Sequence, residues 1–324
     1  MSDYKKRLLE ELDAAEQNSR KQLGIALNKR KPVEDRLAAF NGIGSISDEP
    51  VVRRALDIVD DAEADGRLRA AALEKISHQL GRDEAHLEKL TVMMADKNLP
   101  DPLREAALKA LQANSFSSPT FLANRPTYMG ALRALINDDN RRLSETAIEY
   151  LAMNKDEYVQ RLLVEGLENP KKKLTKPELA VQYLAYDLHA DHFPILRKLA
   201  TNPPNKKTRM EALRNLAADS DSIGLMQETL ADKEENPEVR HLCAVALQRM
   251  DPAKFEKAAD SILRAKSEDA ELKVALVNTK LHTPGTDVPK LATELKKVVD
   301  AATGRAVKAR GQRLSSLISG RRTS

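Results

Sequence analysis

The residues in this sequence that are best suited to chemistry are a histidine pair, a single cysteine and a glycine pair. His189 and His192 are spaced i, i+3, but they lie at a turn without the further ligands that a metal site requires. Cys243 occupies a repeated position that alanine fills in six other copies, so we expect it to pack rather than to react. Gly42 and Gly44 precede no phosphate-binding pattern. We therefore predict no catalytic, cofactor-binding or metal-binding residue.

The element that positions these residues is a repeated helix, whose clearest copy runs from Asp101 to Leu111. Asp101 can cap a helix and Pro102 suits a first helical position. From Arg104, positions +3, +4 and +7 form one apolar stripe at the helical period: Ala107, Leu108 and Leu111. Further copies begin at Arg36, Arg69, Ser144, Pro177, Arg209, Arg240 and Lys273, with spacings from 31 to 40 residues. Such a period indicates a repeat array.

Two copies carry a resemblance to a known family. Residues 101–104 read Asp-Pro-Leu-Arg, and residues 236–240 read Asn-Pro-Glu-Val-Arg. They resemble the second helix of a HEAT repeat, which commonly reads Asp-Pro-x-Val-Arg-x-x-Ala-x-x-x-Leu. The resemblance implies packing rather than chemistry, and it implies a structural ladder formed by the recurring arginines, which are Arg36, Arg69, Arg104, Arg209 and Arg240.

Composition agrees with stacked helices, because apolar residues make up 41% of the chain and aromatic residues only 3%. We predict an all-α fold, a right-handed α-solenoid of about eight HEAT-like helical hairpins, over residues 1–304. It would comprise a long helix over 4–27, repeats over about 33–282 and a capping helix over about 287–303. Residues 305–324 are expected to form a basic, flexible tail. All fifteen prolines fit a turn or a first helical turn.

The 40-residue spacing before Ser144 is the clearest irregularity of the array. The extra residues fall in 114–126, which we predict to be a loop that can bind a partner. The alternative is an insertion without a binding role, whose two phenylalanine side chains fold back over the groove of the array. Aromatic residues gather in the same part of the chain. We predict that five of them form a partner-binding site: Phe116, Phe121, Tyr150, Tyr183 and Tyr186. For Tyr150 and Tyr183, packing between repeats is the alternative.

The groove positions and the C-terminal segment differ in charge, and they therefore suit different classes of partner. The net charge is +4, but residues 305–324 alone carry six basic residues and no acidic one. The positions predicted to face the groove are mixed in charge, which counts against nucleic acid there and leaves the basic tail as its site. In that tail Val307, Leu314, Leu317 and Ile318 could form an apolar face toward a partner, an acidic surface or a membrane. No signal peptide or membrane-length stretch is present, which predicts a soluble, cytoplasmic protein.

The repeat architecture predicts a non-enzymatic scaffold or adaptor that binds a protein of unknown identity. Two alternatives remain open. One is a nucleic-acid-binding protein similar to HEAT-like DNA glycosylases, and the other is a lyase or chaperone subunit similar to HEAT-like bilin lyases. No cofactor is predicted, and neither alternative has a motif of its own in this sequence.

Overall fold

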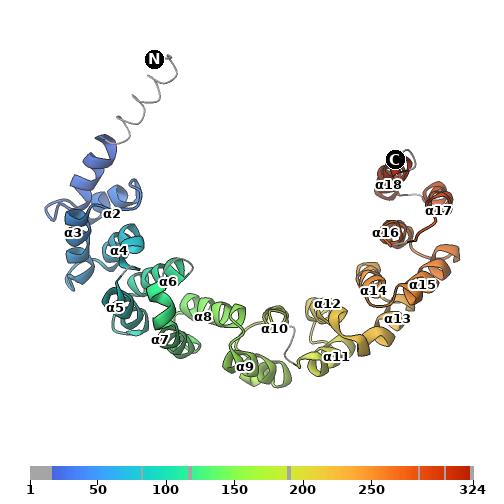
Figure 1. The fold of residues 1–324 in the computed structure, drawn as a ribbon, viewed down its shortest axis with the longest axis horizontal. Helices are drawn as coiled ribbons and strands as arrows, with labels where there is room; N and C mark the ends of the chain where they lie inside the picture. Colours follow the sequence, from blue (N-terminus) through green and yellow to red (C-terminus); the bar gives the residue numbers. More distant parts are fainter. Residues whose placement is uncertain are drawn as a thin grey trace, which may run out of the picture. The chain divides into compact units, whose positions relative to one another are not determined.

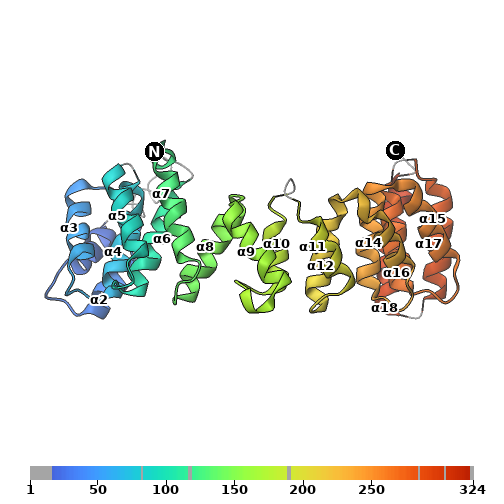
Figure 2. The ribbon, with the colours of Figure 1, turned by 90° about the horizontal axis from the view of Figure 1, so that it is seen from below.

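The computed structural model describes residues 17–81, 83–115, 119–187, 191–283, 285–302 and 304–321. Across these ranges the chain forms helices joined by turns, and no strand occurs in them. Contacts divide the chain into two compact units, Met1–Leu151 and Ala152–Ser324. Within each unit the helices alternate between two layers (Figure 1) and stand side by side (Figure 2). The predicted all-α solenoid of helical hairpins is confirmed.

The first unit opens, in its described part, with a helix over 17–26. Its next helix, α2, carries the first copy of the repeat template. Three hairpins follow, and in each of them an outer helix precedes a helix that carries the template. The bounds are α2 Val33–Asn41, α3 Glu49–Asp60, α4 Gly66–Leu80, α5 Glu84–Ala95, α6 Asp101–Ser115, α7 Pro119–Leu135 and α8 Arg141–Met153.

The second unit continues the alternation and adds three short 3₁₀ turns. Its elements are α9 Glu157–Glu168, η1 Pro170–Lys172, α10 Pro177–Leu184, α11 Phe193–Thr201, α12 Lys206–Asn215, η2 Leu216–Ala218, η3 Ser220–Ser222, α13 Ile223–Ala231, α14 Pro237–Met250, α15 Pro252–Arg264, α16 Ala270–Leu281, α17 Val288–Ala301 and α18 Arg305–Arg321. Helices α12, α14, α16 and α18 form one layer, and α11, α13, α15 and α17 form the other (Figure 1).

Most of these helices start where the sequence offers a cap. The side chain of Asp65 accepts a hydrogen bond from the amide of Arg67 at the start of α4, and Asn236 does the same for Glu238 at the start of α14. These bonds satisfy amides that have no partner inside the helix. Proline occupies the first or second position of α3, α10, α11, α14, α15 and α17, where its missing N–H removes no hydrogen bond.

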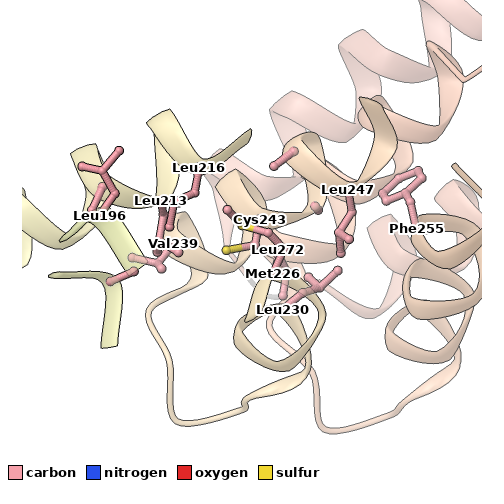
Figure 3. Close-up of a cluster of buried hydrophobic side chains, with 14 of the residues drawn as sticks. Leu196, Leu213, Leu216, Met226, Leu230, Val239, Cys243, Leu247, Phe255 and Leu272 are labelled. Carbon is pink, nitrogen blue, oxygen red and sulfur yellow. The ribbon is translucent and has the colours of Figure 1, made fainter. Parts of the chain in front are cut away.

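The template positions build the core. The +3 and +4 residues of all eight copies are buried, and so are the +7 residues. In the second unit they form a continuous cluster that contains Leu213, Cys243 and Leu247 (Figure 3). Cys243 is fully buried there, and burial raises the pKa of its thiol to about 12. Its role as a packing residue is therefore confirmed, because neither access nor ionisation favours reaction.

The recurring arginines tie each hairpin together. The Nε of Arg104 donates to the backbone oxygen of Met94 at 3.2 Å, and the equivalent bond runs from Arg240 to Leu230 at 2.9 Å. Arg36, Arg69 and Arg209 make the same bond to the preceding helix. In two copies without this arginine, the Oγ of Ser144 donates to the oxygen of Ile136 at 2.5 Å, and the Nζ of Lys273 donates to the oxygen of Ala265. Every copy except the one that begins at Pro177 therefore carries a polar brace as well as its apolar stripe.

Carboxylates of the following repeat complete three of these braces. Asp138 receives two hydrogen bonds from Arg104, at 3.2 and 2.5 Å, and both side chains are buried. Arg209 pairs with Glu235, and Arg240 pairs with Glu268 at 2.8 Å. Each of these arginines thus has a carbonyl partner and a carboxylate partner, although Nη2 of Arg240 and Oε2 of Glu268 form an ion pair without a hydrogen bond between them.

Two expectations from the sequence are corrected by this fold. Residues 119–126 belong to α7 instead of a loop, and Pro126 lies inside that helix. The helix tolerates this proline because Phe121 and Tyr128, on either side of it, are both buried.

The second correction concerns the basic tail. Residues 305–321 form α18, which packs against α16 and α17, so this segment is not a flexible extension. The reason is an apolar stripe: Val307, Leu314 and Ile318 are buried in the last hydrophobic cluster. Gly311 completes the stripe, because a Cβ at that position would lie 2.2 Å from Cγ2 of Val299.

Candidate functional site

The predicted aromatic site does not form a single surface. Phe121 is only 2% exposed, and its ring centroid lies 5.1 Å from that of Tyr128, which in turn lies 5.5 Å from that of Tyr150. Phe121 is therefore a core residue of the first unit and cannot contact a partner in the folded chain. Tyr150 is half-buried against this cluster. Phe116 lies outside the described residues.

The other two predicted aromatics belong to the second unit. Tyr183 is half-buried, whereas Tyr186 is 43% exposed just after the end of α10. Exposure of Tyr186 agrees with the orientation expected from the helical period. A partner-binding role for these tyrosines stays a prediction.

The candidate metal ligands gain no support from the described residues. His189 lies outside them, and His192 is half-buried, so that burial lowers the pKa of its imidazole. Within the described ranges, no group of three or more His, Cys, Asp or Glu side chains is arranged to hold a metal ion. Nor is any described helix both long enough and apolar enough to cross a bilayer.

Helix α18 is the strongest charged feature of the second unit. Its buried stripe faces α16 and α17, which leaves Arg305, Lys308, Arg310 and Arg313 exposed. From Arg305 to the last residue the sequence has no acidic side chain. Among the described residues, none of these four cations has an ion pair. The helix therefore presents concentrated positive charge to solvent.

Two grooves in the same unit are also lined by cations, and no residue of α18 lines either of them. The larger groove, of about 690 Å³, lies between α15, α16 and α17. The smaller groove, of about 430 Å³, lies between α13, α14 and α15. Ala265 and Glu268 line both, so the turn between α15 and α16 forms a common wall. The cations lining the two grooves are Lys233, Arg240, Lys254, Lys257, Arg264, Lys266, Lys273 and Lys297.

The carboxylates of the grooves neutralise only part of this charge. Glu268 is 3% exposed and is already paired with Arg240. Glu294 is the other carboxylate among the lining residues of the two grooves. Asp251 and Asp260, on α15 or its cap, pair with Lys254 at 3.6 Å and with Arg264 at 3.2 Å.

Lys273 has no ion pair to a described residue, but it is half-buried and donates to the backbone oxygen of Ala265. Four exposed groove lysines also have no ion pair to any described residue: Lys233, Lys257, Lys266 and Lys297. Together with the four exposed cations of α18 they define what we call the C-terminal cationic surface. Its members are Lys233, Lys257, Lys266, Lys297, Arg305, Lys308, Arg310 and Arg313, all of which are exposed.

In the first unit, a row of exposed charges on neighbouring template helices is joined by ion pairs. Successive template helices are bridged by ion pairs, from Arg67 to Glu34 at 2.9 Å and from Lys109 to Glu74 at 2.9 Å. Arg142 and Glu105 repeat the pattern at 3.2 Å. Here cations and carboxylates of neighbouring repeats neutralise one another, so this row leaves little net field for a charged ligand. We take the cationic surface of the second unit, which this row does not resemble, as the candidate functional site.

Comparison with known proteins yields one weak structural similarity and no match to a family. No family model matches the chain, and no curated protein matches its sequence. Among solved structures, human deoxyhypusine hydroxylase in complex with glycerol is similar, with 16% sequence identity over 94% of this chain and 96% of that chain and a TM-score of 0.27. The described residues by themselves form an all-α array of helical hairpins. The similarity is too low to carry a reaction or a ligand from one protein to the other.

That neighbour nevertheless corrects one expectation. We predicted a non-enzymatic scaffold because a helical repeat array is typical of binding proteins. Deoxyhypusine hydroxylase is an enzyme, so the step from this architecture to a non-enzymatic role was wrong. Function in a repeat array depends on particular side chains, and the fold alone does not decide it.

The sequence revealed only half of the cationic surface. The acid-free segment 305–324 was visible in the sequence, but we expected it to be a flexible tail. Among the groove lysines, Lys233 lies between Asp232 and Glu234 in the chain and so appeared balanced. The groove lysines come from α15, α17 and two turns, and they line the grooves only when the helices stack.

Proposed function

We propose that this protein binds nucleic acid through the C-terminal cationic surface. The observation that carries the proposal is the set of eight exposed cations with no ion pair among the described residues, gathered on one unit. Phosphate groups would release condensed counterions on meeting such a surface, which favours binding entropically. The two adjoining grooves offer concave places for a phosphate backbone, and α18 adds four further exposed cations in the same unit.

The chemistry of the surface favours nucleic acid over an acidic protein. Protein interfaces depend on a few aromatic or large apolar anchors surrounded by a polar rim. Exposed positions of α18 are instead filled mainly by cations, alanine, serine and glutamine, and Leu317, at 62% exposure, is its single exposed large apolar side chain. A surface of this kind suits a ligand recognised by regularly placed negative charge.

Binding can be tested on the full chain by fluorescence anisotropy. The probe is a labelled DNA duplex of about 20 base pairs, titrated between about 50 and 200 mM salt. The test variant reverses four charges of the surface: Lys257→Glu, Lys297→Glu, Lys308→Glu and Arg313→Glu. The matched control reverses four exposed cations of the first unit and so makes the same change in net charge: Lys21→Glu, Arg30→Glu, Lys31→Glu and Arg54→Glu. Circular dichroism checks that both variants keep their helices.

We expect wild type to bind, with affinity falling steeply as salt rises. The test variant should bind at least about tenfold more weakly, and its salt slope should fall by about 0.9 for each phosphate that it no longer neutralises. The control should stay within about twofold of wild type. An equal weakening in both variants would show attraction by net charge alone and overturn the proposal. Tighter binding to polyglutamate than to DNA would identify an acidic protein as the partner instead.

A further inference from the structure

The cationic surface has no exposed aromatic side chain on which an unpaired base could stack. From residue 194 to the end, Phe255 is the one phenylalanine, tyrosine or tryptophan in the sequence, and it is fully buried. His282 is exposed but follows the C-terminal end of α16, whereas the groove residue Lys273 lies in the first turn of that helix. Proteins that bind single strands combine a positive groove with aromatic side chains that stack on successive bases. Only the first of these two components is present here.

Charge density then decides which form of nucleic acid gains most. A duplex carries one negative charge per about 1.7 Å of its axis, about twice the density of one strand. Counterion release per neutralised phosphate is also larger for a duplex, with a salt slope of about 0.9 per phosphate against about 0.7 for a single strand. A surface that offers cations without stacking therefore gains more from a duplex.

The arrangement of the cations fits contact with a phosphate backbone. Lys257 comes from α15 and Lys297 from α17, on two neighbouring outer helices, while Lys233 and Lys266 lie in turns that precede template helices. These positions repeat along the unit as the hairpins do. Lysine supplies five of the eight cations and acts as a mobile point charge rather than a planar fork, so these five suit contact with phosphate better than reading base edges.

Resting on the proposed function, we infer that the ligand of the C-terminal cationic surface is double-stranded nucleic acid, held by its phosphates without base stacking. The surface should therefore distinguish duplex from single strand more strongly than it distinguishes one base sequence from another.

The experiment compares three labelled probes on the full chain under one salt series. Two are DNA duplexes of unrelated sequence and about 20 base pairs, and the third is an unstructured oligothymidine of the same length. The duplexes should bind with similar affinity, and each should bind at least about threefold more tightly than oligothymidine. A second variant supplies the missing platform: Ala301→Trp, at an exposed position lining the larger groove, with Ala301→Leu as its matched control.

The tryptophan should raise affinity for oligothymidine by about fivefold or more, because stacking is sequence-tolerant, and should change duplex affinity little. The leucine should change neither. Equal or tighter binding of oligothymidine by wild type would overturn the inference while leaving nucleic-acid binding in place. A strong preference between the two duplexes would also overturn it, because bases would then be read. Absence of binding to all three probes would refute the proposed function itself.

Discussion

The buried brace between two repeats of the first unit offers a sharp test of how the array is held together. Arg104 is 3% exposed, donates from Nε to Met94 and makes a two-point ion pair with Asp138. Burial opposes ionisation of Asp138, but the hydrogen bonds from Arg104 and the amide of Asn140 outweigh it and hold the pKa of that carboxyl below its usual range. The perturbation we choose is Arg104→Met, which keeps the aliphatic volume and removes the guanidinium.

The expected cost follows from what the substitution leaves behind. The Asp138 side chain is 1% exposed, so without Arg104 it becomes a buried carboxylate that lacks its main cationic partner. Breaking a buried pair in this way costs about 3 to 5 kcal/mol. The double variant Arg104→Met/Asp138→Leu removes both charges and should recover most of that stability, because two apolar side chains leave no stranded charge. An exposed pair in the same unit, Lys109 with Glu74, should contribute below about 1 kcal/mol.

Hydrogen exchange on the full chain is the appropriate assay, because a repeat array need not unfold in one step. Exchange protection of the peptide covering α6 should fall strongly in Arg104→Met, recover in the double variant and change little in Lys109→Met. Urea denaturation followed by circular dichroism provides the accompanying midpoint. If protection fell no further in Arg104→Met than in Lys109→Met, the brace would contribute no more than an exposed ion pair, and our account of the repeat interface would be refuted.

Two further predictions concern the last hairpins. Burial opposes ionisation of Asp260, but the hydrogen bond from the largely buried Lys280 holds the pKa of this carboxyl below its usual range. The ionised Asp260 therefore stabilises the fold above its ordinary pKa of about 4, and this stabilisation is lost as pH falls through the lowered pKa. Circular dichroism during acidification should show a steeper loss of stability in wild type than in Asp260→Asn, and equal slopes would contradict this. Gly311→Ala would place a methyl group against Val299, and such overpacking costs about 1 to 3 kcal/mol. Limited proteolysis should then release α18 faster than in Leu317→Ala, whose side chain is exposed, and identical rates in the two variants would disprove close packing at Gly311.

Much of the fold could be predicted because one local pattern determines it. Small, bulky and apolar residues at +3, +4 and +7 from each template origin require a helix with one buried face, and the eight copies leave few other places for turns. Even the last, degenerate copy follows the rule. Its +7 residue, Lys280, is buried like the leucines of other copies, with its charge neutralised by Glu256 and Asp260.

The errors arose where two local signals competed. Residues 114–126 contain serines, asparagines and prolines that favour a loop, but Phe121 and Tyr128 lie seven residues apart and become buried together when α7 forms across Pro126. Burial of two aromatic rings outweighs the cost of one proline in a helix, which is about 3 kcal/mol. A comparable competition in the tail was decided by Val307, Leu314 and Ile318, whose burial holds a helix rich in cations.

The candidate site was less predictable, because pairing of charges is a property of three dimensions. Arg209 and Lys233 are both basic residues near acidic neighbours in the sequence, yet Arg209 pairs with Glu235 while Lys233 has no ion pair in the part of the chain that the structure describes. In the amino-acid composition, Arg209 and Lys233 each count as one basic residue. The structure separates cations that brace the array from cations that remain available to a ligand.

The sign of the charge on α18 can be explained by a ligand but not by the packing of the helix. A helix that packs through one face must present a polar face to water, and charges of either sign, or a mixture, would satisfy this need. The first unit shows that this chain readily alternates Glu34, Arg67, Glu74 and Lys109 along one row. Residues 305–324 instead contain six basic residues and no acidic one, so their positive charges repel one another. A negatively charged ligand would offset this repulsion, which is why we place the function of the protein at this end of the second unit.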